Sequence, residues 1–374
     1  MSSFPRFLLK VLVLYLLVNL LFGLASEWNI GAFSLYNHIY SGRMRFPFGE
    51  TPQEAYNFSL FNLDAMFASH EIVAIKHSNE YRILIIGDSS VWGTLLKPEE
   101  TLAGQLNAKN LKLGDNRQVH FYNLGYPTIS LTKDLLILDQ AQKYQPDMVI
   151  WLMTLEAFPI DKQLAVPLVE NNPREVLTII DRYNLNFGQN HLTPPTFWES
   201  TFIGRRKELA DLFRMQAYGI MWAATGIDQV YPTEYPLAAV DLDENIRFHA
   251  AENWDGPINR YLAFEPIESA LRQAGKTQFL LVNEPILVST GKNSDLRYNF
   301  YYPRWAYDRY LAEMEVFTQK HQVDYLNAWN TVPSDQFTNS AIHINRDGVT
   351  QLSEAISARL LQMWAKPVEN IGAK

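Results

Sequence analysis

The sequence predicts an α/β protein built on a five-stranded parallel sheet, with a transmembrane helix before it and a helical insertion within it. Three observations support this fold class. Short apolar segments alternate with helical segments, as they do in parallel βαβ units. The alternation stops over 160–260, where proline pairs and scattered aromatic residues replace it. An apolar run over 7–25 is long enough to cross a bilayer.

The first run of alternating strands and helices begins at Tyr81. Pro98 followed by two glutamates is typical of a helix N-terminus, and Ser130 is placed to cap the next helix. The expected strands are 82–87, 118–125 and 147–153, and the helices between them are 98–106 and 130–145.

The alternation resumes after the interruption, in which one helical stretch is expected near 205–224. Two short strands are expected at 278–284 and 323–327, and three helices at 266–275, 305–320 and 348–364. The chain therefore divides into an N-terminal anchor (1–26), a connector (27–80), a core in two segments (81–160 and 276–366) and an insertion or cap (161–275).

The N-terminal apolar run predicts where the protein resides. Arg6 and Lys10 precede or enter its start and Glu27 follows its end, so the positive-inside rule places the N-terminus in the cytoplasm and the remainder outside. A cleaved signal peptide is the competing interpretation, because Gly23 and Ala25 are small residues at a plausible cleavage spacing. The run is long for a signal peptide, so a single-pass signal anchor is favoured.

Composition excludes several classes of function. The formal net charge of −8 argues against binding to nucleic acid, which requires a basic face. The chain has no cysteine, which excludes disulfides, thiol catalysis and cysteine metal sites. It also lacks a histidine pair with metal-binding spacing and a phosphate-binding glycine loop. No metal ion or other cofactor is therefore expected.

The segment ILIIGDSSVWG (83–93) ends a buried strand on a polar turn. Sites in doubly wound sheets form at the carboxyl ends of the strands, and Ser89 lies at such an end, directly before a helix. Backbone amides of the turn are placed to stabilise an oxyanion. Because a serine hydroxyl is a weak nucleophile without a base, a base is expected at the same edge.

His343 is the candidate base among the eight histidines. It precedes the last predicted helix, in a loop that follows the fifth strand and opens at the carboxyl edge of the sheet. We therefore expect His343 and Ser89 to meet, although they are far apart in sequence.

Three short blocks in this order resemble the SGNH/GDSL hydrolases. GDSS (87–90), NLGYP (123–127) and HINRDG (343–348) are similar to the first, second and last blocks of that family. The resemblance implies a flavodoxin-like three-layer sandwich, a nucleophile at Ser89, a base at His343, and oxyanion donors at the amides of Ser89 and Gly125. The expected substrate contacts within the blocks are Asp88, Thr154 and Glu156.

The chain departs from the family pattern at two positions. Leu155 stands where the third block has an asparagine oxyanion donor, and Thr154 or Asn283 is a candidate replacement. Ser340, preceded by Asn339, stands where the family has the aspartate that orients the histidine. Asp335 is the nearest acidic residue upstream and is the candidate third catalytic member. A lost oxyanion donor costs ~10²–10³ in rate, and a wrong triad acid ~10⁴.

Two functions of different kinds remain open. The first is an exported, membrane-anchored serine esterase or O-acyltransferase that acts on an acyl ester of a cell-surface glycan or lipid. The second is a non-catalytic binding or scaffold protein of the cell envelope, on the same fold, that assists a membrane-bound O-acyltransferase. The first predicts covalent chemistry at Ser89, and the second predicts none.

Overall fold

The computed structural model describes residues 3–25, 34–35, 42–49, 59–187, 192–229 and 237–365. At its centre lies a five-stranded parallel sheet with the strand order β2-β1-β3-β4-β5. This is the flavodoxin-like order, so the predicted fold class is confirmed. The strands are β1 (Glu80–Ile86), β2 (Gln118–Asn123), β3 (Met148–Met153), β4 (Gln278–Asn283) and β5 (Asp324–Asn327).

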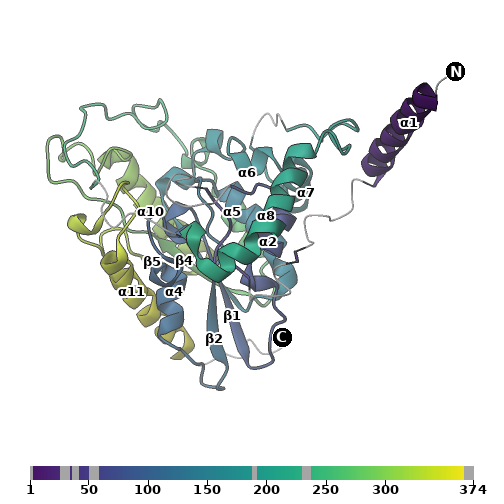
Figure 1. Cartoon of the computed structure of the whole chain (residues 1–374). Helices are drawn as coiled ribbons and strands as arrows, with labels where there is room; N and C mark the ends of the chain where they lie inside the picture. Colours follow the sequence, from purple (N-terminus) through teal and green to yellow (C-terminus); the bar gives the residue numbers. More distant parts are fainter. Residues whose placement is uncertain are drawn as a thin grey trace, which may run out of the picture.

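Helices cover both faces of the sheet, which explains why its central strands are apolar without alternation (Figure 1). Ile83 and Ile85 belong to the core cluster on one face, and Leu84 and Ile86 belong to the cluster on the other. The first face is covered by α4 (Leu102–Ala108) and α11 (Arg346–Ala365). The second is covered by α5 (Leu131–Ala141), α9 (Glu265–Arg272) and α10 (Arg304–His321).

The stretch between β3 and β4 contains helices that the sequence analysis did not predict. α6 (Pro167–Glu170) and α7 (Pro173–Tyr183) come before the expected helix, α8 (Arg206–Thr225). Both new helices begin with proline, which is favoured at the first helical position because that N–H needs no partner. Pro167 and Pro173 therefore start helices, whereas the pair Pro194-Pro195 lies outside them. Val176 and Ile179 of α7 are buried in the same core cluster as the sheet.

The connector also contributes to the core. α2 (Leu63–Ala68) buries Met66 and Phe67 in the cluster that covers the second face of the sheet. Its N-cap is Asn62, whose side chain accepts a hydrogen bond from the Ala65 N–H.

The N-terminal helix α1 (Ser3–Leu24) projects from the body of the molecule (Figure 1). Its segment Phe4–Leu24 is long and apolar enough to cross a membrane, because 21 residues of helix span ~31 Å. A signal sequence near the N-terminus has the same length and composition.

A buried histidine beside α2 makes stability depend on pH. His70 is fully buried and neutral: its Nε2 lies 3.0 Å from the Asn123 carbonyl oxygen, and its Nδ1 accepts from the Ile72 N–H at 3.1 Å. Burial lowers its pKa from 6.5 to about 4. Since the unfolded state then binds the proton more tightly, the contribution of His70 to the unfolding free energy is complete above pH 6.5. It is lost as the pH falls toward 4.

We expect His70→Gln to flatten the pH dependence of stability in this range. Between pH 8 and pH 4, the unfolding free energy of the wild type should fall by ~3 kcal/mol more than that of the variant. Urea unfolding of the detergent-solubilised protein at several pH values measures this. If the unfolding free energies of the two proteins changed with pH in parallel, the prediction for His70 would be contradicted.

Candidate active site

The candidate nucleophile lies on a tight turn between β1 and a short helix. β1 ends at Ile86, and Ser89 is the first residue of α3 (Ser89–Trp92). Asp88 is the N-cap and accepts a hydrogen bond from the Ser90 N–H at 2.8 Å. Gly87 has a φ of 154°, and a Cβ there would lie 2.7 Å from the Val91 side chain, so only glycine fits this turn.

Ser89 and His343 meet at the carboxyl edge of the sheet, as the sequence predicts. The distance between Ser89 Oγ and His343 Nε2 is 2.7 Å, across 254 positions of sequence. His343 lies in a loop closed by a bridge between Phe337 and Ile344, just before α11. Both side chains are partly exposed.

The third member of the arrangement is Asn339. Its Oδ1 lies 2.8 Å from His343 Nδ1, and the same oxygen accepts from the Thr338 hydroxyl at 3.4 Å. An amide oxygen at Nδ1 places the imidazole proton on that nitrogen, so the Nε2 lone pair faces the Ser89 hydroxyl. This is the tautomer that a general base requires. Burial lowers the pKa of His343 to about 4, so the ring is neutral at pH 7.

Asp335, the expected third catalytic member, does not hold the His343 ring. It lies exposed in the short 3₁₀ helix Ser334–Gln336, while Asn339 holds Nδ1. The sequence pattern gives Asn339 no role, because the aspartate of the SGNH/GDSL pattern stands three residues before the histidine. The bend of the loop brings the residue four positions before His343 to the ring instead.

Placing a carboxylate at position 339 is expected to make His343 a stronger general base. In Asn339→Asp, the negative charge would stabilise the imidazolium, and the acid limb of the rate should move up from about pH 4. The rate at the plateau should rise by ~5–30-fold, equivalent to 1–2 kcal/mol. The pH dependence of ester cleavage measures both, and an unmoved acid limb would show that Asn339 does not act on His343.

The oxyanion donors differ from the expectation. The Gly125 N–H donates to Asn123 Oδ1 at 3.0 Å and is already used. Packing requires glycine at position 125, since a Cβ there would lie 2.4 Å from the Trp92 nitrogen. The Ser89 N–H makes no hydrogen bond within the described part of the chain, so it is free to donate.

Neither candidate replacement for the missing asparagine reaches the site. Asn283 is fully buried, with its amide bonded to Asn327 Oδ1 at 3.0 Å and its oxygen to the Tyr310 hydroxyl at 3.1 Å. Thr154 is also fully buried and donates to the Tyr302 hydroxyl at 3.1 Å. Both side chains therefore support the core rather than a substrate, which contradicts the substrate contact expected at Thr154.

Glu156 lies at the end of β3 among charged partners rather than beside Ser89. It forms an ion pair with Lys162, and its carboxylate lies 3.2 Å from His249 Nε2. Burial acts to raise the pKa of Glu156, but the bonds from His249 and Lys162 outweigh it and hold the pKa below its usual value. His249 was missed by the sequence analysis. It sits at a φ of 46° in a two-residue turn, a strained conformation that no motif reveals.

A buried charged cluster lies beneath the nucleophile turn. The Lys133 ammonium donates to the Gly87 carbonyl at 2.7 Å and to the Tyr126 carbonyl at 3.0 Å, and it lies 2.5 Å from Asp134. All these groups are buried, so the ammonium ties the turn to α5 in a medium where charge interactions are strong.

Two further acids complete the cluster. Glu284 follows β4 and accepts a hydrogen bond from the Ser90 hydroxyl. Burial and the nearby charge of Asp88 raise the pKa of Glu284 well above its usual value. Burial also raises the pKa of Asp88, although the Ser90 N–H and Lys133 offset part of this effect. Asp88 is thus a buried cap of the turn, and the expectation that it contacts substrate is wrong.

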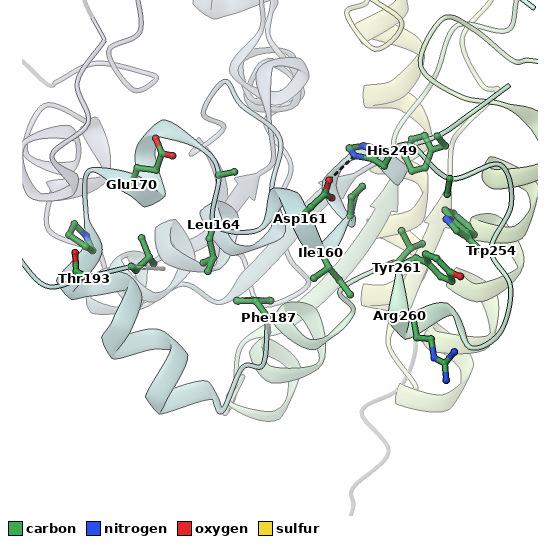
Figure 2. Close-up of a pocket in the computed structure, with 17 residues that line it drawn as sticks. Ile160, Asp161, Leu164, Glu170, Phe187, Thr193, His249, Trp254, Arg260 and Tyr261 are labelled. Atoms are coloured by element: carbon green, nitrogen blue, oxygen red, sulfur yellow. Dashed lines mark hydrogen bonds and ion pairs between the residues drawn. The ribbon is translucent and has the colours of Figure 1, made fainter. Parts of the chain in front are cut away.

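A cavity of about 880 Å³ is lined mainly by residues of the insertion (Figure 2). Its wall is apolar at Ile160, Leu164 and Phe187, and His249 reaches Asp161 at 3.4 Å on its rim. A smaller cavity of about 350 Å³ shares His249 and adds Glu156. The two cavities therefore adjoin at the His249 side chain.

Comparison with known proteins gives esterases among the solved structures. A carbohydrate acetylesterase from Sinorhizobium meliloti is 14% identical over 75% of this chain and 99% of its own, with a TM-score of 0.33. A psychrotrophic esterase from Pseudoalteromonas sp. is 12% identical over 76% and 100%, with a TM-score of 0.38. An aryl esterase from M. smegmatis is 12% identical over 75% and 98%, with a TM-score of 0.34.

No protein-family model matches the chain, and no curated protein matches it. The chemistry of the site therefore follows from the geometry of this chain's own side chains. That geometry is a serine, a neutral histidine and an asparagine in hydrogen-bonded series at the carboxyl edge of a flavodoxin-like sheet.

Proposed function

We propose that this protein is a serine esterase or O-acyltransferase of SGNH type, with Ser89 as nucleophile, His343 as base and Asn339 as the residue that orients the base. The observation that carries the proposal is the 2.7 Å contact of Ser89 Oγ with Nε2 of a half-buried, neutral imidazole whose Nδ1 faces Asn339 Oδ1. A histidine in a capping or surface role does not require this series of bonds.

The proposed reaction proceeds in two halves. His343 Nε2 takes the Ser89 proton as Oγ attacks the ester carbonyl carbon, and the Ser89 N–H stabilises the oxyanion. The intermediate collapses to an acyl-serine as the leaving alcohol takes the proton from His343. Water or an acceptor hydroxyl then attacks the acyl-serine, giving up its proton to His343, and the acyl product leaves as Oγ is reprotonated.

The substrate class and location form part of the proposal. An acyl ester of a glycan or lipid at the cell surface fits a chain whose N-terminal helix is long enough to anchor it in a membrane. The N-terminus would be cytoplasmic and the catalytic domain outside, because Arg6 and Lys10 lie at the start of the helix. The two cavities lined largely by the insertion are large enough to take part of such a substrate.

A second function is favoured by one observation. Of the expected oxyanion donors only the Ser89 N–H is free, because the Gly125 N–H is bonded to Asn123 and the Asn283 amide is bonded in the core. A site with so few donors suits a non-catalytic binding protein that assists a membrane-bound O-acyltransferase. Such a protein would form no acyl-serine.

One experiment separates the two functions. The protein is exposed to a fluorophosphonate and the adduct is located by mass spectrometry, in wild type, His343→Ala and Ser90→Ala. The esterase or transferase predicts a single adduct on Ser89 that is lost in His343→Ala and retained in Ser90→Ala, since Ser90 is bonded to Glu284 instead. No adduct on Ser89 in the wild type would refute the enzyme and support the binding protein.

A further inference from the structure

A group of apolar side chains on the outer surface of the insertion is exposed although the core is well packed. Trp198 is 75% exposed and Phe213 is 67% exposed. The group, here termed the outer aromatic surface, consists of Trp198, Phe202, Ile203, Phe213, Tyr218 and Met221. Large exposed apolar side chains that recur along one segment and the helix after it are typical of a contact surface.

The helix α8 has apolar side chains on two sides. Leu209 and Leu212 are buried against the domain, whereas Phe213, Tyr218 and Met221 are exposed on the outward side. A surface helix needs only one apolar stripe, which faces the core. The outward stripe therefore indicates a second apolar environment.

The outer aromatic surface is continuous with the end of α1. The Phe22 and Phe202 rings lie 5.7 Å apart, edge to face. The Ile203 N–H donates to Asn19 Oδ1 at 3.1 Å. Since Asn19 lies five residues before Leu24, the end of α1, Ile203 lies ~7–8 Å inward along the helix axis from that end. Interfacial protein segments bury their apolar faces to a similar depth, ~5–10 Å.

The backbone of the segment before α8 suits such a depth. Polar backbone groups must be satisfied internally where water is scarce. The Ser200 N–H donates to the Thr196 carbonyl at 3.1 Å, and the Arg205 N–H donates to the Thr201 carbonyl at 2.9 Å. These bonds form a compact turn that directs Trp198 outward.

The flanking charges suit a lipid surface. Arg206 and Lys207 are exposed in the first turn of α8, next to the apolar side chains. Basic residues beside aromatic side chains are typical of segments that lie at the headgroup level of anionic membranes.

We propose that the outer aromatic surface lies in the interface of the bilayer that α1 spans, as a second membrane contact of this protein. This rests on the anchoring role of α1 in the proposed function but not on the chemistry at Ser89. A single helix leaves a domain free to tilt, and a second contact fixes the orientation of the domain on the membrane.

The absence of cysteine from the chain allows a clean test. Single cysteines are introduced in the full chain as Trp198→Cys and Phe213→Cys, labelled with a nitroxide, and reconstituted in nanodiscs of phosphatidylcholine and phosphatidylglycerol. Collision rates with O₂, which concentrates in lipid, and with a water-soluble nickel chelate report the surroundings of each label. At both positions the O₂ collisions should exceed the nickel collisions.

Two further labels serve as controls. Ile75→Cys, on an 87% exposed side chain before β1, should show the reverse ratio. Leu14→Cys, within α1, should favour O₂ strongly. Nickel-dominated collisions at 198 or 213 would overturn the proposal, and low collision with both reagents would identify a protein partner instead. A water-exposed label at 14 would refute the anchor itself, whatever the reactivity of Ser89.

Discussion

Replacing Ser89 with alanine is expected to lower the rate of activated-ester cleavage by ~10³-fold or more, and His343→Ala should have an effect of similar size. The reason is the single proton-transfer path between them: Ser89 Oγ has His343 Nε2 at 2.7 Å as its acceptor. The double variant should be no slower than either single variant, because each removal disables the same unit. Steady-state rates of the three variants on one activated ester measure this.

Ser90→Ala is the matched control for this series. Ser90 is adjacent to the nucleophile and equally part of α3, but its hydroxyl is bonded to Glu284. We expect Ser90→Ala to retain most of the activity. Additive losses in the Ser89 and His343 double variant would show that the two residues act separately and would contradict the proposed pair.

Lys133→Met is expected to destabilise the protein by ~3–5 kcal/mol, the largest effect on stability among these predictions. The substitution leaves Asp134 buried without its cation and removes the donor from the carbonyls of Gly87 and Tyr126. Urea unfolding of the detergent-solubilised protein measures the loss. Labelling of Ser89 by fluorophosphonate should also slow, because the Gly87 carbonyl anchors the nucleophile turn.

Two variants control for this prediction. Lys143→Met removes an exposed lysine from the same region of the chain, and its effect should stay within ~0.5 kcal/mol. In Lys133→Met combined with Asp134→Leu, part of the stability should return, because the Asp134 carboxylate no longer lies buried without its cation. A loss below ~1 kcal/mol in Lys133→Met would show that the cluster does not hold the turn.

The catalytic candidates show where sequence reasoning reached its limit. Ser89 and His343 were predictable because both follow strands whose carboxyl ends must share one edge of a parallel sheet. The role of Asn339 in orienting His343 was not predictable. It depends on the bend of the loop between Phe337 and Ile344 rather than on residue type. Gly125 failed as a donor for a related reason, since the Asn123 side chain turns back to accept its N–H.

The sequence by itself determined the five parallel strands of the core segments and the place of the nucleophile turn. Apolar strands separated by helices permit few parallel topologies, and a Gly-Asp-Ser turn after the first strand projects its serine from the sheet. Only the tertiary structure decided which polar groups remain free. Asn283, Thr154 and Glu156 have suitable chemistry, but packing bonds them to Tyr310, Tyr302 and His249. Whether a polar side chain is free to contact a substrate depends on neighbours that are distant in sequence, and residue type alone does not reveal those neighbours.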